Sequence, residues 1–249
     1  MNVLITGATS GIGLAAAKLF LKRGHNVLIV GMNEQRDQQV TADLQSGTEQ
    51  AVFFYPADIT KAEEIHKIYL FSKQKLSSID CLINIAGIFT GGMLHETTEE
   101  AWDRIFAVDV KSVFLMSKAF VPDMIRQGGG TIVNTASVSG MLGDYNMAAY
   151  NAAKGALVNL VRAMALDYGK YNIRVNNICP AACATPMFLS NPPEVIEAFN
   201  QANPLRRICT PDEVAEAMYF WASDASRSCN GINLEVTGCS NVHTGQPVQ

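Results

Sequence analysis

The sequence predicts an α/β fold in which helices cover both faces of one parallel sheet. Short apolar runs alternate with segments of helical periodicity from the first residues to about residue 234. The strand-like runs are apolar throughout, as in Val27-Leu28-Ile29-Val30, rather than alternating with polar residues. Such runs are typical of strands that are buried on both faces of a sheet. Strands separated by helices are joined by right-handed crossovers, and they therefore pair in parallel.

Seven apolar runs are predicted as strands, and helical segments lie between them. The strands are expected at about residues 3–5, 27–30, 51–55, 79–85, 131–135, 173–178 and 232–236. The first helix should cover residues 12–22 and end at Gly24, and a polar helix should follow as far as Leu44. Further helices are expected at 65–76, at 102–126 before three glycines, and at 150–168, and Pro211 begins the last one.

The chain is expected to form a single domain over residues 1–249. This length is ample for a full hydrophobic core, and no repeat, low-complexity tract or linker divides the chain. A proline-rich stretch after residue 184 interrupts the rhythm of strands and helices. We interpret residues 184–210, approximately, as a substrate flap.

Composition excludes several classes of protein. The 19 basic and 23 acidic side chains give a net charge of −4, whereas binding to nucleic acid or to a membrane surface needs a basic patch. No apolar run approaches the ~18–20 residues of a membrane span, and the first residues lack the basic leader of a signal peptide. The six cysteines include no C-x-x-C pair, so we expect reduced thiols, no metal site and a cytoplasmic location.

A glycine-rich turn, Thr6-Gly7-Ala8-Thr9-Ser10-Gly11-Ile12-Gly13, joins the first strand to the first helix. Gly7 permits a tight turn, Gly11 lets the backbone approach a pyrophosphate, and Gly13 allows close packing of the helix. The start of the helix supplies N–H groups and the positive end of a dipole to phosphates. Such turns can also serve packing alone, but the position after the first strand favours nucleotide binding.

The end of the second strand bears on the choice of cofactor. Many dinucleotide sites place an acidic residue there to hold the adenosine ribose, but this chain has Gly31-Met32-Asn33. An arginine for the 2′-phosphate of NADP is missing there too, and Ser10 is uncharged. Arg36 is the nearest cation, and we interpret it as a solvated helix residue. The sequence therefore favours NAD over NADP.

Three residues form a candidate catalytic group. Tyr150 and Lys154 are four residues apart near the start of a helix, so both side chains project from one face. A nearby ammonium stabilises a phenolate, which can take a proton from an alcohol. Ser137 ends the fifth strand, at the edge where parallel sheets bind ligands, and its hydroxyl can hold the reacting oxygen. A tyrosine and a lysine at this spacing can also be a plain surface pair.

The whole chain resembles the short-chain dehydrogenase/reductase family, in its branch of about 250 residues. The resemblance rests on the glycine turn, Asn84-Ile85-Ala86-Gly87, Ser137, Tyr150 to Lys154, Pro180, Thr185-Pro186-Met187 and the segment 220–224. It implies a Rossmann-type fold and a nicotinamide cofactor. It also implies that Tyr150 is the acid/base, that Ser137 holds the substrate oxygen, and that Lys154 binds the nicotinamide ribose.

The resemblance also assigns the cofactor site. It implies that Asp58 meets the adenine amine, that Asn84 lies alongside the cofactor, and that Thr185 and the backbone of Cys183 hold the carboxamide. The full expected set is Gly7, Thr9, Ser10, Gly11, Ile12, Gly13, Met32, Asp58, Ile59, Asn84, Ala86, Gly87, Tyr150, Lys154, Pro180, Cys183 and Thr185.

One departure from the family concerns proton transfer. The family usually has an asparagine in the long middle helix whose backbone supports a water, whereas this chain has Asp109. A carboxylate could still order that water. If it lies close, its charge raises the pKa of Lys154 and disfavours the Tyr150 phenolate. We therefore count Asp109 with the catalytic residues and expect a pH optimum that is displaced upward.

The expected substrate is a small neutral alcohol or ketone. Mainly apolar residues should surround the reacting carbon, and no arginine or lysine among them can pair with a carboxylate or a phosphate. They are Ile88, Phe89, Met93, Ser139, Met141, Leu142, Tyr145, Asn146, Met187, Phe188 and Leu189. Ser139, Asn146 and Met187 are the candidate substrate contacts, although several of the set can equally be core or flap residues.

Assembly and competing functions complete the expectations. Two predicted helical segments are apolar around more of their circumference than a half-buried helix requires, namely 102–120 and 148–166. Charged residues make up only 17% of the chain. The family resemblance implies a homotetramer that assembles through these two helices. One alternative function is an NADP-dependent 3-ketoacyl-type reductase, for which Arg206 and Arg207 could receive an acidic carrier. The other is a catalytically silent nucleotide-binding protein of this fold.

Overall fold

The computed structural model describes residues 1–242, and residues 243–249 of the expected domain lie outside the described part. Its centre is a parallel sheet with strand order β3-β2-β1-β4-β5-β6-β7. The strands are β1 (Asn2–Thr6), β2 (Asn26–Gly31), β3 (Val52–Pro56), β4 (Cys81–Asn84), β5 (Gly130–Thr135), β6 (Ile173–Pro180) and β7 (Asn233–Val236). Seven strands were predicted, and all seven form within a few residues of the expected positions.

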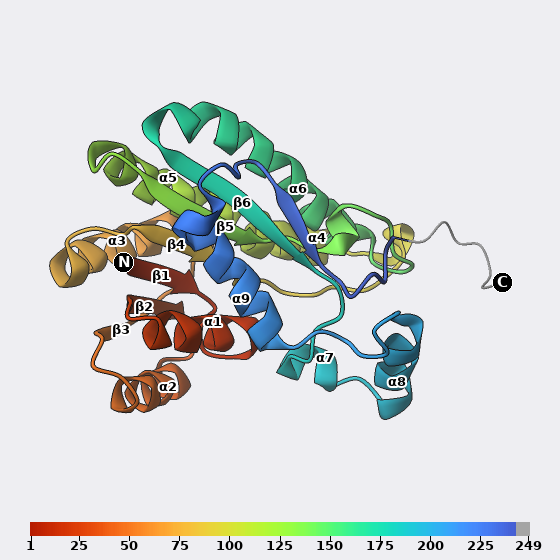
Figure 1. Cartoon of the computed structure of the whole chain (residues 1–249). Coiled ribbons are helices and arrows are strands. Elements are labelled where there is room, and N and C mark those ends of the chain that lie inside the picture. Colours follow the sequence, from red (N-terminus) through yellow and green to blue (C-terminus); the bar gives the residue numbers. More distant parts are fainter. Residues whose placement is uncertain (243–249) are drawn as a thin grey trace.

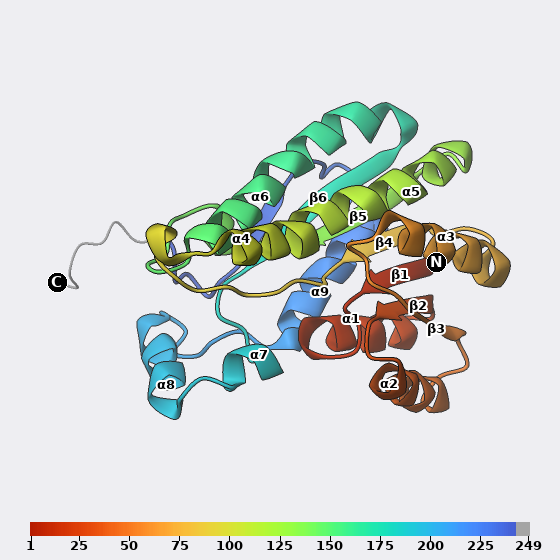
Figure 2. The same ribbon diagram turned by 180° about the vertical axis from the view of Figure 1, so that it is seen from behind.

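Helices cover both faces of the sheet, which confirms the predicted doubly wound fold. On one face α1 (Gly11–Lys22) packs beside α9 (Pro211–Ala222), and α2 (Glu34–Ser46) lies near the β3 edge (Figure 1). On the other face lie α3 (Ala62–Leu76), α5 (Ser112–Arg126) and α6 (Ala148–Tyr168), as seen from behind in Figure 2.

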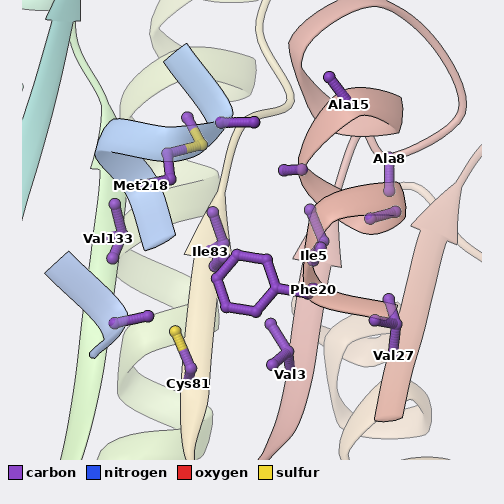
Figure 3. Packing of buried hydrophobic residues seen from close by; sticks show 14 of the residues in the cluster. Val3, Ile5, Ala8, Ala15, Phe20, Val27, Cys81, Ile83, Val133 and Met218 are labelled. Atoms are coloured by element: carbon purple, nitrogen blue, oxygen red, sulfur yellow. The ribbon is translucent and has the colours of Figure 1, made fainter. Parts of the chain in front are cut away.

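The two faces hold two large apolar clusters. In the first cluster the ring of Phe20 from α1 lies among side chains of β1, β2 and β4 and below Met218 of α9 (Figure 3). Phe20 is fully buried. The β-branched strand residues supply a flat apolar surface, and the helices cover it with small and aromatic side chains.

The helix predicted at 102–126 is in fact three consecutive segments. It begins earlier, as α4 (Glu99–Ile105), where the side chain of Thr98 caps the first turn. A π-helical turn (Phe106–Lys111) follows, and then α5. Periodicity in the sequence did not reveal the π-helical turn, because it changes the register of the helix by a single residue.

The strand order reverses its direction of growth between β1 and β4. Ligands bind beyond the carboxyl ends of the strands at such a point in open parallel sheets. In the region expected to form the flap lie α7 (Pro186–Leu189) and α8 (Pro193–Ala202), which stand apart from the two helical layers (Figure 1). Within residues 1–242, no helix is long and apolar enough to span a membrane.

Candidate active site

The glycine-rich turn forms a cradle of backbone between β1 and α1. Gly7 has a φ of +71°, and a Cβ there would lie 2.9 Å from the backbone of Ala86. Gly11 has a φ of +50°, and a Cβ there would lie 3.0 Å from Thr185 of the flap region. Both positions therefore require glycine. The turn therefore lies against Ala86, which follows β4, and against Thr185, and both residues were expected to contact the cofactor.

The start of α1 is suited to an anion. Its N-cap residue, Ser10, makes no side-chain capping bond, and the first turn contains no acidic residue. Ile12 and the buried Gly13 follow in that turn. A helix start without a side-chain cap leaves backbone N–H groups for a ligand. Together with the glycine cradle, this arrangement fits the pyrophosphate of a dinucleotide.

A second group of expected cofactor residues lies along neighbouring strand ends. Asn84 ends β4 and is followed by Ala86 and Gly87, and Pro180 ends β6. Asp58 and the buried Ile59 follow β3. Because the strands are parallel, all of these residues lie along one edge of the sheet.

The Asp58 carboxylate is held in its charged form. Its Oδ1 accepts hydrogen bonds from the backbone N (3.0 Å) and the hydroxyl (2.7 Å) of Thr60. Burial alone would raise the pKa of Asp58, but these hydrogen bonds and the nearby Lys61 and Arg104 outweigh it and lower the pKa. The ionised Asp58 carboxylate can therefore accept a further hydrogen bond from an amine.

Four asparagines form a ladder across the sheet that sequence reasoning missed. Asn84, Asn134, Asn177 and Asn233 stand in register on β4, β5, β6 and β7. Their amides are hydrogen-bonded in a row, at 2.9, 3.1 and 2.7 Å. At the β4 end, the buried Oδ1 of Asn84 has no hydrogen-bond partner among residues 1–242. An unpaired buried acceptor beside the glycine cradle is consistent with the expected place of Asn84 alongside a cofactor.

Lys154 and Asp109 form a buried ion pair at the start of α6. Lys154 Nζ lies 2.9 Å from Asp109 Oδ2, and the two side chains are 6% and 0% exposed. Lys154 Nζ also donates a hydrogen bond of 3.0 Å to the carbonyl oxygen of Thr135 at the end of β5. Asp109 Oδ1 accepts a hydrogen bond of 2.8 Å from the backbone N of Ile88. Asp109 therefore ties Lys154 to the segment that follows β4.

Electrostatics keep the lysine charged. Burial alone would lower the pKa of Lys154. The electrostatic interactions with Tyr150 and Asp109 and the hydrogen bond to Asp109 outweigh this effect and raise the pKa of Lys154. The expectation that a close Asp109 raises the pKa of Lys154 is confirmed. Lys154 is therefore an ammonium at neutral pH.

Tyr150 and Ser137 are the other two members of the expected catalytic group. Tyr150 is in the first turn of α6, with its ring centre 5.6 Å from Lys154 Nζ and 5.5 Å from the ring of Phe89. Ser137 follows β5, and its Oγ accepts a hydrogen bond of 3.1 Å from the backbone N of Ser139. The same Oγ lies 3.5 Å from the carbonyl oxygen of Pro180.

The expected substrate residues fall on separate segments of the chain. Ser139 is buried within the turn that Ser137 begins, and Met187 is exposed on α7. Asn146 adopts a positive φ of 56°, and its carbonyl oxygen accepts a hydrogen bond of 2.6 Å from Gly92. Cys183 is buried next to Cys209 at the edge of the flap region.

The segment after β2 differs from the interpretation of its sequence. Met32 is exposed there. Arg36 is exposed as expected, but its Nη2 also donates a hydrogen bond of 2.9 Å to the Thr9 hydroxyl in the glycine turn. Its neighbour Asp37 is completely buried, which no feature of this polar helix indicated.

Comparisons with known proteins identify the family of the chain. A family model described as enoyl-(acyl carrier protein) reductase matches residues 7–240. The chain is 40% identical over 245 residues to meso-2,3-butanediol dehydrogenase of Serratia marcescens, covering 98% of this chain and 96% of that protein. It is 34% identical over 238 residues to cyclopentanol dehydrogenase of a Comamonas species, covering 95% of each.

A solved structure extends the likeness to three dimensions. It is a 7α-hydroxysteroid dehydrogenase in complex with NADH and 7-oxo glycochenodeoxycholic acid, with a TM-score of 0.91 and 33% identity, covering 95% of this chain and 92% of that one. The chain belongs to the short-chain dehydrogenase/reductase family, and it is an oxidoreductase that transfers a hydride between a nicotinamide cofactor and a secondary alcohol or ketone.

Proposed function

We propose that the protein interconverts a small neutral secondary alcohol and its ketone with NAD(H), and that Tyr150, Lys154, Ser137 and Asp109 carry the chemistry. The observation behind this proposal is the buried Lys154 ammonium, held between Asp109 and Thr135 and 5.6 Å from the Tyr150 ring. A charge fixed in a site of low polarity acts strongly on a neighbouring phenol.

In the oxidative direction, Tyr150 as phenolate takes the hydroxyl proton of the alcohol. The ring stays in place because it begins α6 and packs against Phe89. A nicotinamide bound along this edge of the sheet would supply the acceptor for the hydride of the carbinol carbon. Ser137 donates a hydrogen bond to the substrate oxygen, whose negative charge grows as the proton leaves. The Lys154 ammonium stabilises the phenolate, and the Asp109 carboxylate offsets part of the positive charge of Lys154.

Residues of the glycine cradle and the strand ends would hold the cofactor. Gly7, Gly11 and the start of α1 would bind the pyrophosphate, and Asn84 would lie beside the nicotinamide half. The remaining expected cofactor residues would lie between Asp58, at the adenine, and Thr185, at the nicotinamide carboxamide. NAD is preferred over NADP in this proposal, since Met32 and Ser10 offer a 2′-phosphate no charge.

The substrate class follows from the side chains that were expected to surround the reacting carbon. Phe89, Met93, Leu142 and Met187 are apolar and exposed, and methionines adapt to several shapes. We expect residues 184–210 to close over the substrate as a flap. Because the Serratia marcescens relative is a butanediol dehydrogenase, small vicinal diols and hydroxyketones are the first substrates to test.

The 3-ketoacyl alternative receives less support. It would need free basic residues to receive an acidic carrier, and Arg206 and Arg207 were the candidates. Arg207 instead donates hydrogen bonds of 2.8 and 2.6 Å to Glu213, and Arg206 donates to Gln201. The charge of Arg207 is therefore offset by Glu213, whereas the hydrogen bond from Arg206 to a neutral oxygen does not offset its charge.

The test is the change in nicotinamide absorbance with purified protein, butanediol, acetoin and simple cyclic alcohols. We predict turnover with the native chain and a loss of at least about 10²-fold in Tyr150→Phe, since the general acid/base is removed. Binding of NADH, followed by its fluorescence, should persist in the variant. Turnover that survives Tyr150→Phe would remove Tyr150 from the mechanism. An inactive native chain that binds NADH would contradict the substrate class.

The assembly and the location remain predictions. We expect a homotetramer through the helical run 99–126 and α6, and we expect the protein in the cytoplasm.

A further inference from the structure

A buried carboxylate lies where the second strand ends, although the strand itself supplies none. Asp37 is in the first turns of α2, and its side chain is 0% exposed. The described buried residues of this helix are Asp37 and Leu44, seven positions apart and therefore on the same face. A core position of α2 is thus occupied by a carboxylate. Burial of a charge costs free energy unless the charge is paired or hydrogen-bonded, and buried ionisable groups are often found at functional sites.

The Asp37 carboxylate fills the space of a side chain at residue 31. A Cβ built on Gly31 would lie in direct contact with Asp37 Oδ2, 3.0 Å from its Cγ and 3.6 Å from Thr9 Cγ2. Residue 31 is the last of β2. In dinucleotide sites an acidic side chain in this region accepts hydrogen bonds from the adenosine ribose.

The Asp37 carboxylate is held firmly, whereas Arg36 is not. Asp37 Oδ2 accepts a hydrogen bond of 3.1 Å from the backbone N of Asn33, and the start of α2 favours its charge. Arg36 lies over it, with Nε 2.9 Å from Asp37 Oδ1 and Nη2 2.9 Å from the Thr9 hydroxyl. The Arg36 side chain is 56% exposed, so it can turn into solvent once other hydrogen-bond donors, such as ribose hydroxyls, replace it at the buried Asp37 carboxylate.

We propose that Asp37 is the residue that reads the adenosine ribose and selects NAD over NADP. It supplies from α2 the carboxylate that Gly31 cannot carry on β2. When the cofactor binds, Arg36 turns away, and its two acceptors, Asp37 Oδ1 and the Thr9 hydroxyl, become available to the ribose hydroxyls. A 2′-phosphate at the same place would face a fixed negative charge. This inference rests on the proposed function, because it concerns the cofactor of that reaction.

Arg36 defines the competing outcome. If its guanidinium keeps its place between Asp37 and Thr9, it would bind a 2′-phosphate, and NADP would be preferred. The burial of Asp37 and the exposure of Arg36 favour the carboxylate as the fixed element of the site.

The test moves the carboxylate between the two positions and needs no substrate. Dissociation constants for NADH and NADPH are measured by fluorescence titration for the native chain, Asp37→Ala, Asp37→Asn, Arg36→Gln and two double variants. Gly31→Asp with Asp37→Ala returns a carboxylate to the strand end. Gly31→Ala with Asp37→Ala is its matched control without a charge. Circular dichroism checks that each variant is folded.

We expect the native chain to bind NADH at least about tenfold more tightly than NADPH, since each bidentate or charge-assisted contact contributes on this order. Asp37→Ala and Asp37→Asn should abolish most of that preference by weakening NADH. Gly31→Asp with Asp37→Ala should restore it, and the alanine control should not. Arg36→Gln should leave NADH binding equal or tighter.

Three results would overturn the proposal. They are a native preference for NADPH that Arg36→Gln removes, an unchanged NADH/NADPH ratio in Asp37→Ala, and a failure of the Gly31→Asp double variant to regain the preference. Because binding alone is measured, these results are independent of turnover. A chain that prefers NADH but oxidises no alcohol would contradict only the proposed function.

Discussion

At the scale of single residues, the charge of Lys154 determines how the site responds to pH. Asp109 uses both of its oxygens, one for Lys154 and one for the backbone of Ile88. Its carboxylate therefore both positions Lys154 and weakens the pull of that lysine on Tyr150. An asparagine can accept through one oxygen only, so the two effects can be separated by substitution.

We predict that Asp109→Asn lowers the pH at which alcohol oxidation reaches half its maximum. Removing a negative charge beside Lys154 leaves the ammonium free to stabilise the Tyr150 phenolate, which then forms at lower pH. A shift of about one pH unit is the expected size for a charge at this distance. The measurement is kcat/KM against pH for both proteins. Asp103→Asn, an exposed residue of α4, is the matched control, and superimposable profiles for native and Asp109→Asn would refute the argument.

The functional role of a residue could be predicted from the sequence where the chemistry requires a fixed spacing. It could not be predicted where the role depends on how two elements pack together. The turn from Gly7 to Gly13 and the pair Tyr150 and Lys154 are recognisable because backbone geometry fixes the intervals. Asp37 is different. It lies in a polar helix, and only the approach of that helix to Gly31 makes it a buried group beside Thr9.

At the scale of elements, the long middle helix shows what periodicity leaves out. Its apolar pattern predicted one regular helix, and the π-helical turn at 106–111 is invisible in that pattern. The turn matters to the site because Asp109 lies within it, buried and facing Lys154. π-helical turns occur frequently at functional sites.

The start of α9 gives a prediction about stability. Thr210 Oγ1 accepts a hydrogen bond from the backbone N of Glu213 (3.3 Å), and Glu213 Oε2 accepts one from the backbone N of Thr210 (2.8 Å). Thr210→Ala should lower the free energy of unfolding by about 1 kcal/mol, and Tm by ~2–4 °C. Thermal unfolding measures this, with Thr210→Ser expected to unfold like the native chain. An unchanged Tm in the alanine variant would mean that the cap contributes nothing.

The same cap should have a defined dependence on pH. Hydrogen bonds from Arg207 and from the backbone of Thr210 lower the pKa of Glu213 from 4.5 to about 2. A lowered pKa contributes stability that is complete above the ordinary value and is lost as the pH falls through the lowered one. The difference in the free energy of unfolding between the native protein and Glu213→Gln, which has no ionisable group at this position, should therefore be constant from pH 7 to 5 and shrink between pH 4.5 and 2.

At the scale of the whole molecule, the order of the strands follows from the alternation of strands and helices, because right-handed crossovers allow few topologies. Quaternary structure depends on what the helices leave uncovered. On the face that carries α5 and α6, Phe114 is 50% exposed and Leu166 is 83% exposed. These two exposed apolar side chains are the positions on α5 and α6 at which the expected assembly can be tested.

We predict that these two side chains are covered by other copies of the chain. The native protein should elute as a tetramer of a 27.0 kDa chain in light scattering coupled to gel filtration. Leu166→Glu and Phe114→Glu should shift it to smaller species, because a charge in an apolar interface is costly to bury. Leu70→Glu is the control, since Leu70 is a similarly exposed residue (53%) on α3, outside the proposed interface. A native monomer, or an equal effect of Leu70→Glu, would contradict assembly through α5 and α6.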